Sequence, residues 1–132
     1  MKLEHIAIWT HQLEVLKAYY MKYFDAIPGE IYHNPNKQFH SYFLTFESGA
    51  RLELMSSPTI PENLNDTIDK EHLGIIHMAF EVKSKHAVDT KAAVLTQDGY
   101  SILSGPRTTG DGYYEFATLD PDNNRLEVTM QA

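Results

Sequence analysis

The stretches that decide the fold are RLELM at residues 51–55 and RLEVT at residues 125–129, two nearly identical segments in a chain of 132 residues. Each places a glutamate, Glu53 or Glu127, between apolar neighbours. Because successive side chains of a β-strand point to opposite faces, both glutamates fall on the face opposite the apolar residues. The repetition indicates that the two halves of the chain share one structural plan.

The repeat extends well beyond these two glutamates. It pairs HIAIW (5–9) with HMAFE (77–81), and YFLTFESGARLEL (42–54) with YEFATLDPDNNRLEV (114–128). The second alignment places Phe43 opposite Phe116. Because a repeated set of segments is the signature of a repeated supersecondary unit, a duplicated module is expected.

Both halves also show the same order of predicted elements. Apolar residues at helical spacing predict one helix ending at Phe24, with Thr10 or His11 as its cap, and a second between Ser84 and Asp98-Gly99. Alternating apolar residues predict strands at 2–9, 29–33, 39–47, 51–56, 75–82, 100–104, 113–119 and 124–130.

The predicted fold class is therefore α+β, with two βαβββ modules that form a cupped mixed β-sheet and helices on the outer face. We expect a single domain over residues 1–132. Module one covers about 1–56 and module two about 75–132. The proline-bearing, polar segment of about 57–74 between them is predicted to be a linker or extended loop.

Composition excludes several classes of function. The formal net charge is −7 and the eleven Lys and Arg residues are scattered, which argues against nucleic acid as a partner. The chain has neither an apolar run long enough for a membrane span nor a start typical of a signal peptide. Cysteine is absent, so thiolate chemistry is excluded and a cytoplasmic location is expected.

Each of the two glutamates has a histidine on the corresponding face of an earlier strand, His5 for Glu53 and His77 for Glu127. If the sheets curl around these mixed faces, the four side chains converge in one cup. Two imidazoles and two carboxylates suit a divalent ion of borderline hardness such as Zn, Ni, Co, Mn or Fe(II). Taken singly, such residues are usually solvated or structural; their recurrence at equivalent places favours a metal site. The other histidines are expected to be structural or surface residues: His11, His33, His40, His72 and His86.

These segments, in this order and spacing, resemble the vicinal oxygen chelate superfamily, the group of glyoxalase I, bleomycin resistance proteins and dioxygenases. The resemblance covers essentially the whole chain and is closest to glyoxalase I-like proteins. It rests on HIAIW, AYYMKYFDAIPG, RLEL, HMAFEV and DPDNNRLEV, the last being close to the D-P-D-G-N-x-x-E signature. The resemblance implies two βαβββ modules around a cup, which are often paired across a dimer interface, so a homodimer is expected.

In metal-dependent members the first and last strands of each module supply the ligands. The resemblance thus implies that His5, Glu53, His77 and Glu127 bind the ion, as in glyoxalase I. It further implies a lyase or isomerase that acts on a small oxygenated substrate through a metal-stabilised enediolate, with Glu127 and Glu53 as catalytic bases. Two alternatives stay open: a non-catalytic antibiotic-binding or resistance protein, and another metalloenzyme of the superfamily (dioxygenase, epimerase or thiol transferase).

One position departs from the glyoxalase I pattern. Trp9 stands where that enzyme usually has an arginine that holds a glutathione carboxylate, so lactoylglutathione lyase activity itself is left open. An indole can instead pack an apolar or aromatic substrate, although a core tryptophan is an equally good interpretation. The expected substrate-binding residues are Trp9, Arg51, Met55, Arg107, Tyr113 and Arg125, for several of which surface or packing roles explain the sequence equally well.

Overall fold

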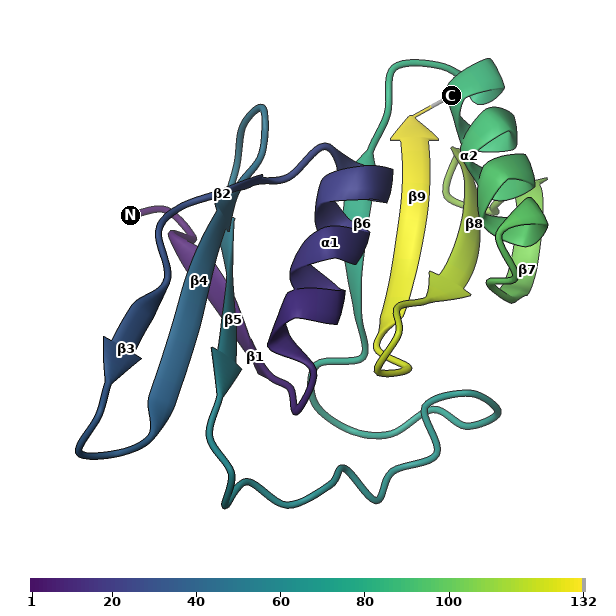
Figure 1. The fold of residues 1–132 in the computed structure, drawn as a ribbon. Helices are drawn as coiled ribbons and strands as arrows, with labels where there is room; N and C mark the ends of the chain where they lie inside the picture. Colours follow the sequence, from purple (N-terminus) through teal and green to yellow (C-terminus); the bar gives the residue numbers. More distant parts are fainter. Residues whose placement is uncertain (132) are drawn as a thin grey trace. The chain divides into compact units, whose positions relative to one another are not determined.

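Apolar residues at strand and helix spacing produce two units of the same kind in the computed structural model, which describes residues 1–131 (Figure 1). One compact unit spans Met1–Asn63, and the other begins at Leu64. Each unit contains one helix and one mixed β-sheet, so the predicted α+β class is confirmed. The expectation that residues 1–132 form a single domain stays a prediction.

The first unit contains one helix packed on a sheet with the strand order β1-β5-β4-β2, in which β3 also pairs with β4. Strand β1 runs parallel to β5, and the remaining pairs are antiparallel. The elements are β1 (His5–Trp9), α1 (Leu13–Phe24), β2 (Ile27–Pro28), β3 (Tyr32–Asn34), β4 (Phe39–Thr45) and β5 (Arg51–Ser56).

The core of this unit lies between α1 and the apolar face of the sheet. Leu16 and Tyr20 on the helix are fully buried, as are Leu44 and Leu54 on the strands. Removing a leucine side chain from water contributes about 1.5–3 kcal/mol, so this interface provides much of the stability of the unit. The helix ends where Asp25 adopts a left-handed conformation with a φ of 55°.

The predicted cap of α1 is wrong. The N-cap position is Gln12, which makes no side-chain capping bond. Thr10 accepts a hydrogen bond from the Gln12 N–H at 3.0 Å, but it stands two residues before the N-cap position and therefore does not cap the helix. His11 instead places its Nε2 atom 2.7 Å from the carbonyl oxygen of Ile60. Both side chains therefore order the approach to the helix rather than its first turn.

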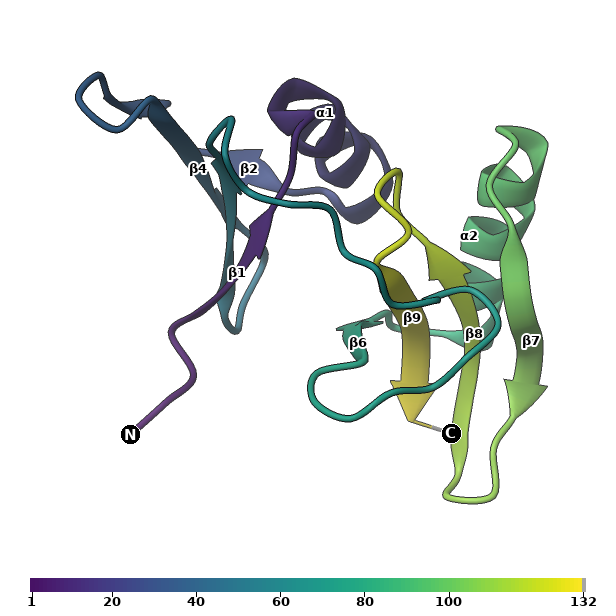
Figure 2. The ribbon, with the colours of Figure 1, turned by 90° about the horizontal axis from the view of Figure 1, so that it is seen from below.

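The second unit repeats this plan with the strand order β6-β9-β8-β7, and β6 runs parallel to β9. Helix α2 packs on β7, β8 and β9 (Figure 2). The elements are β6 (His77–Glu81), α2 (Lys85–Gln97), β7 (Ile102–Thr108), β8 (Tyr113–Leu119) and β9 (Arg125–Gln131).

The predicted ends of the second helix are confirmed. The Ser84 hydroxyl accepts a hydrogen bond from the Ala87 N–H at 3.1 Å, which satisfies one of the free donors of the first turn. The chain leaves the helix at Asp98, and Gly99 follows with a φ of 91°. The predicted stripe is buried against the sheet: Val88, Ala92 and Leu95.

The turn between β8 and β9 is organised by one buried carboxylate. Asp120 is 2% exposed, and its oxygens accept hydrogen bonds from the Asp122 N–H, the Asn124 N–H and the Asn124 side-chain amide, each at 2.9 Å. Asn123 takes a left-handed conformation with a φ of 63°. This turn sets the register in which β9 pairs with β8.

Residues 57–74 contain neither a helix nor a strand. Among residues 1–131, no helix is long and apolar enough to cross a membrane.

Candidate functional site

In the first unit the parallel pairing of β1 and β5 brings one histidine and one glutamate together. His5 lies opposite Arg51 and Ala7 lies opposite Glu53, so His5 and Glu53 are diagonal neighbours on one face of the sheet. The His5 Nε2 atom lies 3.8 Å from the nearer carboxylate oxygen of Glu53. We call the face of each sheet that carries the histidine and the glutamate the mixed face. The opposite face carries the apolar residues of the core.

The second unit repeats the arrangement. His77 lies opposite Arg125 and Ala79 opposite Glu127 in the parallel pair of β6 and β9. The His77 Nε2 atom lies 3.3 Å from a carboxylate oxygen of Glu127. The recurrence of histidine and glutamate in the sequence therefore becomes a recurrence of side-chain pairs in space.

Both pairs fit a divalent metal ion in the kind of ligand, and the second pair also fits in spacing. Nitrogen and oxygen ligands on one ion, each bonded at about 2.0–2.2 Å, lie about 2.9–3.4 Å from one another. The separation of 3.3 Å in the second unit falls within this range, and that of 3.8 Å in the first is slightly wider. The part of the chain that the structure describes contains no group of three or more His, Asp and Glu side chains close enough to hold a metal. Each unit thus supplies two ligand candidates, and their union in one centre stays a prediction.

Glu4 orients the imidazole of the first pair. Its Oε1 atom lies 3.3 Å from Nδ1 of His5, and its Oε2 atom accepts a hydrogen bond from Nε of Arg51 at 3.0 Å. The Phe43 ring also contacts His5 edge-to-face, with centroids 5.3 Å apart. A carboxylate on one ring nitrogen is the common way to direct the other nitrogen of a histidine at a metal. The hydrogen bonds from Arg51 lower the pKa of Glu4 to about 2, so this carboxylate is charged at neutral pH.

Sequence analysis missed Glu4, although its position immediately before His5 was a usable signal. Side chains on neighbouring residues of a strand point to opposite faces, so alternation alone assigns Glu4 to the wrong side. Glu4 precedes the first residue of β1, and its carbonyl oxygen accepts a hydrogen bond from the Arg51 N–H at 2.8 Å while its side chain reaches Nδ1 of His5.

The two arginines expected to bind substrate both have protein partners. Arg51 donates to Glu4 and lies over the Phe43 ring, 4.0 Å from its centroid. Arg125 donates from Nη1 to Glu71 at 2.6 Å and from Nη2 to the carbonyl of Thr67 at 2.9 Å, and its side chain is only 11% exposed. Arg125 therefore ties β9 to residues 67–71, and contact of either arginine with substrate stays a prediction.

Glu127 is a half-buried carboxylate with altered acidity. Burial raises the pKa of Glu127, and the neighbouring carboxylate of Glu115 adds to this effect. The interactions with His77, Arg107 and Arg125 act in the opposite direction and lower the pKa of Glu127. Because burial is the largest cause, Glu127 holds a proton more readily than an exposed glutamate does.

Strand pairing corrects the sequence alignment of the two halves. Phe43 lies opposite Glu53, whereas the residue opposite Glu127 is Ala117, not Phe116. The partner of each glutamate stands ten residues before it, because the turns at 46–50 and 120–124 have the same length, so the sequence alignment is displaced by one residue at Phe116. An aromatic ring therefore flanks the first histidine–glutamate pair, and a methyl group flanks the second.

The other predicted substrate-binding residues lie on strands of both units. Trp9 ends β1 and Met55 lies opposite it on β5. In the second unit Arg107 pairs with Glu115 across β7 and β8, and Tyr113 begins β8 with 37% of its surface exposed. Their roles in binding stay predictions.

The chain matches the family model of the Glyoxalase/Bleomycin resistance protein/Dioxygenase superfamily over residues 2–128. It therefore belongs to this superfamily, and the resemblance seen in the sequence is confirmed. A curated relative, the uncharacterized protein YqjT of Bacillus subtilis (strain 168), is 37% identical over 59 residues, which cover 42% of this chain and 46% of that protein. The matched region thus spans less than half the length of that relative.

Solved structures share the fold over nearly all of the chain. The glyoxylase/bleomycin resistance protein/dioxygenase domain from Frankia sp. EAN1pec superposes with a TM-score of 0.80 at 17% identity, covering 100% of this chain and 98% of that one. A trypanothione-dependent glyoxalase I from Leishmania major gives a TM-score of 0.76 at 17% identity, with 99% and 87% covered. A glyoxalase family protein from Enterococcus faecalis gives 0.71 at 22%, with 98% and 95% covered. At these identities the likeness establishes the fold.

Proposed function

We propose that the chain is a metal-dependent enzyme of the glyoxalase I type, a lyase or isomerase that acts on a small oxygenated substrate. The observation that carries this proposal is the histidine–glutamate pair at the same register in both units, with separations of 3.8 and 3.3 Å. Membership of a superfamily that includes glyoxalases supports it. In this proposal His5, Glu53, His77 and Glu127 would hold one divalent ion, which would act as a Lewis acid toward a substrate oxygen.

The two glutamates are proposed to move the proton. A carboxylate takes a proton from a substrate carbon and returns it to the neighbouring carbon, so the isomerisation needs no further reactant. Glu127 is suited to this role by its position, because its half-buried carboxylate lies 3.3 Å from Nε2 of His77. Glu53 occupies the matching position in the first unit, with a side chain that is only 16% exposed.

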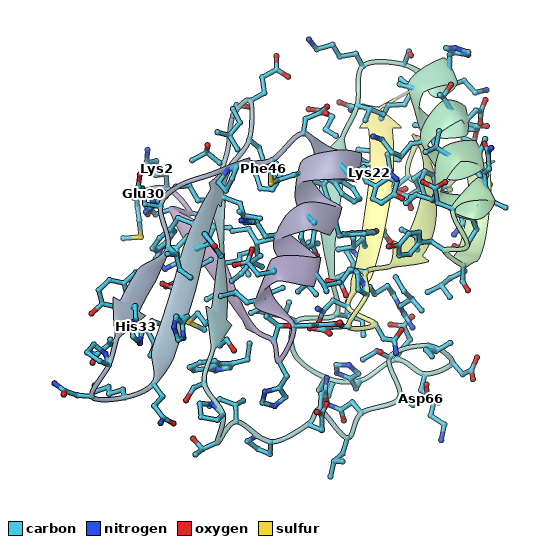
Figure 3. All side chains as sticks on the ribbon, in the orientation of Figure 1. Lys2, Lys22, Glu30, His33, Phe46 and Asp66 are labelled. Carbon is cyan, nitrogen blue, oxygen red and sulfur yellow. The ribbon has the colours of Figure 1, made fainter. Side chains whose placement is uncertain are left out.

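Metal analysis of purified variants tests the ligand set. After reconstitution with Ni, Co, Zn or Mn, we expect stoichiometric metal in the wild type and its loss in His77→Ala and Glu127→Ala. His33→Asn is the matched control, because His33 lies on β3 and stacks on His40 with ring centroids 4.2 Å apart, outside the histidine–glutamate pairs (Figure 3). No metal in the wild type after reconstitution, or loss of metal in the control, would contradict the proposal.

An activity assay separates the proposed reaction from its alternatives. The metal-loaded protein is expected to convert the hemithioacetal of methylglyoxal with glutathione, or with another thiol, and Glu127→Gln is expected to lose most of that activity. Bound metal without turnover of any hemithioacetal would point to another metalloenzyme of the superfamily. Ligand binding that chelators leave unchanged, without turnover, would point to a sequestering protein.

A further inference from the structure

Aromatic side chains gather on the mixed face of the first unit, beyond the histidine–glutamate pair. Trp9 lies opposite Met55, Met55 opposite Ser41, and Ser41 opposite Tyr32, so this row crosses β1, β5, β4 and β3. Phe39 lies on the same face two residues from Ser41. Its ring meets that of Trp9 at 86° with centroids 5.9 Å apart, and that of Tyr32 at 60° with centroids 6.0 Å apart. We call Trp9, Tyr32, Phe39 and Met55 the aromatic shelf.

The shelf is not part of the core of its unit. Trp9 is 44% exposed and Tyr32 is 55% exposed, whereas the helix tyrosines Tyr19, Tyr20 and Tyr23 are buried. Leaving two large rings in water forgoes the free energy that their burial would provide. Core packing therefore does not account for these residues, and a ligand that covers them would recover that free energy.

The shelf adjoins the proposed reaction site. Trp9 and Met55 lie two residues along their strands from Ala7 and Glu53. Two residues of strand span about 7 Å, the length of a phenyl group and the bond that attaches it to a reacting carbon. A substrate held at Glu53 can therefore place a ring on the shelf without a linker.

The chemistry of the shelf selects an uncharged ring. Its four members carry no formal charge, and the nearest arginine of the same strand, Arg51, is bound to Glu4 and Phe43. The Trp9 and Phe39 rings meet nearly at right angles, which is the edge-to-face arrangement that aromatic groups prefer. A further aromatic ring can extend this contact, whereas an anionic group would lose hydration without gaining a partner.

We propose that the aromatic shelf binds an aryl group of the substrate. This inference rests on the proposed function for the position of the reacting oxygen. The binding of the ring depends only on residues of the first unit.

Two hydroxamates test the proposal, because they share the two neighbouring oxygens and differ only in phenyl against methyl. Benzohydroxamate is expected to bind the Zn-loaded protein about tenfold more tightly than acetohydroxamate in calorimetry. Trp9 is the only tryptophan of the chain, so its fluorescence reports whether the ring reaches the shelf. Only benzohydroxamate should change that fluorescence strongly.

Variants of the aromatic shelf test where the phenyl ring of benzohydroxamate binds. Tyr32→Ala is expected to reduce the tenfold preference to about threefold or less, and Tyr32→Phe to retain most of it. Val15→Ala is the control, because Val15 is 49% exposed on α1, away from the mixed face, and its loss should leave the preference intact.

The outcomes separate this inference from the proposed function. Equal affinities for the two hydroxamates would contradict binding of the aryl group at the shelf. Benzohydroxamate binding that leaves the fluorescence of Trp9 unchanged would contradict it as well. Neither result would contradict the proposed metal site. A third result is possible, in which the protein binds neither Zn nor acetohydroxamate, but benzohydroxamate still changes the fluorescence of Trp9. This result would support binding of the aryl group at the shelf and contradict the proposed metalloenzyme. Binding of neither compound would overturn the shelf as well.

Discussion

Glu4 illustrates how a single residue can prepare a site. Its carboxylate lies between the His5 ring and the Arg51 guanidinium, and Phe43 closes the same cluster from β4. The imidazole is therefore held on two sides, with Nε2 facing Glu53. The corresponding residue before His77 is Ile76, which offers no such partner. The two halves of the proposed site are thus prepared differently.

Replacing Glu4 tests this orientation. Glu4→Gln keeps the shape of the side chain and removes its charge, so we expect metal affinity to fall about 10–100-fold while the fold is retained. Competition with a chromogenic chelator measures the affinity, and circular dichroism checks the fold. Glu30→Gln is the control, since Glu30 is an exposed acid outside the strands that carry the histidine–glutamate pairs. Equal affinities in the wild type and Glu4→Gln would show that Glu4 does not position His5.

A second cluster predicts how stability depends on pH. Tyr42 donates a hydrogen bond to Glu14 at 2.6 Å, and Lys17 lies 3.0 Å from the other carboxylate oxygen. The bond from Tyr42, followed by that from Lys17, lowers the pKa of Glu14 below its ordinary value of 4.5. A lowered pKa in the folded state gives stability that is present above the unfolded pKa and is lost as the pH falls through the folded one.

We therefore expect Tyr42→Phe to be less stable than the wild type by about 1 kcal/mol near neutral pH, a modest value because Glu14 is largely exposed. The difference should shrink as the pH falls below the ordinary glutamate pKa of 4.5 and Glu14 becomes protonated in the folded state. Urea unfolding at a series of pH values measures it. A difference that stays constant down to pH 2 would mean that the bond to Glu14 is not its source.

At the scale of elements, the periodicity of the sequence predicted both helices and most strands, because a helix or strand face depends on the spacing of nearby residues. The structure differs from these predictions where the ends of a strand depend on its pairing with a neighbouring strand. Strand β1 begins at His5 rather than residue 2, since its pairing with β5 starts opposite Arg51. Strand β7 continues past the Gly105-Pro106 pair, because it is an edge strand whose irregular pairing with β8 accommodates a proline.

The turn between β8 and β9 gives a prediction at this scale. Asp120→Ala removes the acceptor of three hydrogen bonds at a buried position, so we expect the free energy of unfolding to fall by about 2–4 kcal/mol. Urea unfolding measures this loss. Asp111→Ala in the neighbouring β7–β8 turn is the control, because that turn is exposed and the loss there should be much smaller. Similar losses in both variants would show that Asp120 does not organise its turn.

At the scale of the whole molecule, the strand that carries the histidine of the histidine–glutamate pair lies at one edge of the sheet in each unit. Among residues 1–131, β1 pairs with β5 alone and β6 with β9 alone. An edge strand presents unpaired N–H and C=O groups that can take up another strand. This arrangement supports the proposal that the protein assembles as a homodimer.

We expect sedimentation equilibrium to give a mass of twice 15.1 kDa at micromolar concentration. Mixing His5→Ala with His77→Ala protein adds a second measurement. If each metal site takes its two pairs from two copies, a mixed dimer recovers one intact site, and metal binding returns in part. A monomer at all concentrations would contradict the homodimer, and a dimer without recovery on mixing would place each site within one chain.

The sequence by itself determined the duplicated βαβββ plan and the face on which His5, Glu53, His77 and Glu127 lie, because alternation depends only on covalent spacing. The tertiary structure decided which residues meet across long separations. Glu4 and Arg51 are 47 residues apart, and Arg125 and Glu71 are 54 apart. The pairing of Ala117 with Glu127 likewise depends on how the Asp120 turn closes. Such contacts follow from strand register and turn geometry, which local periodicity does not contain.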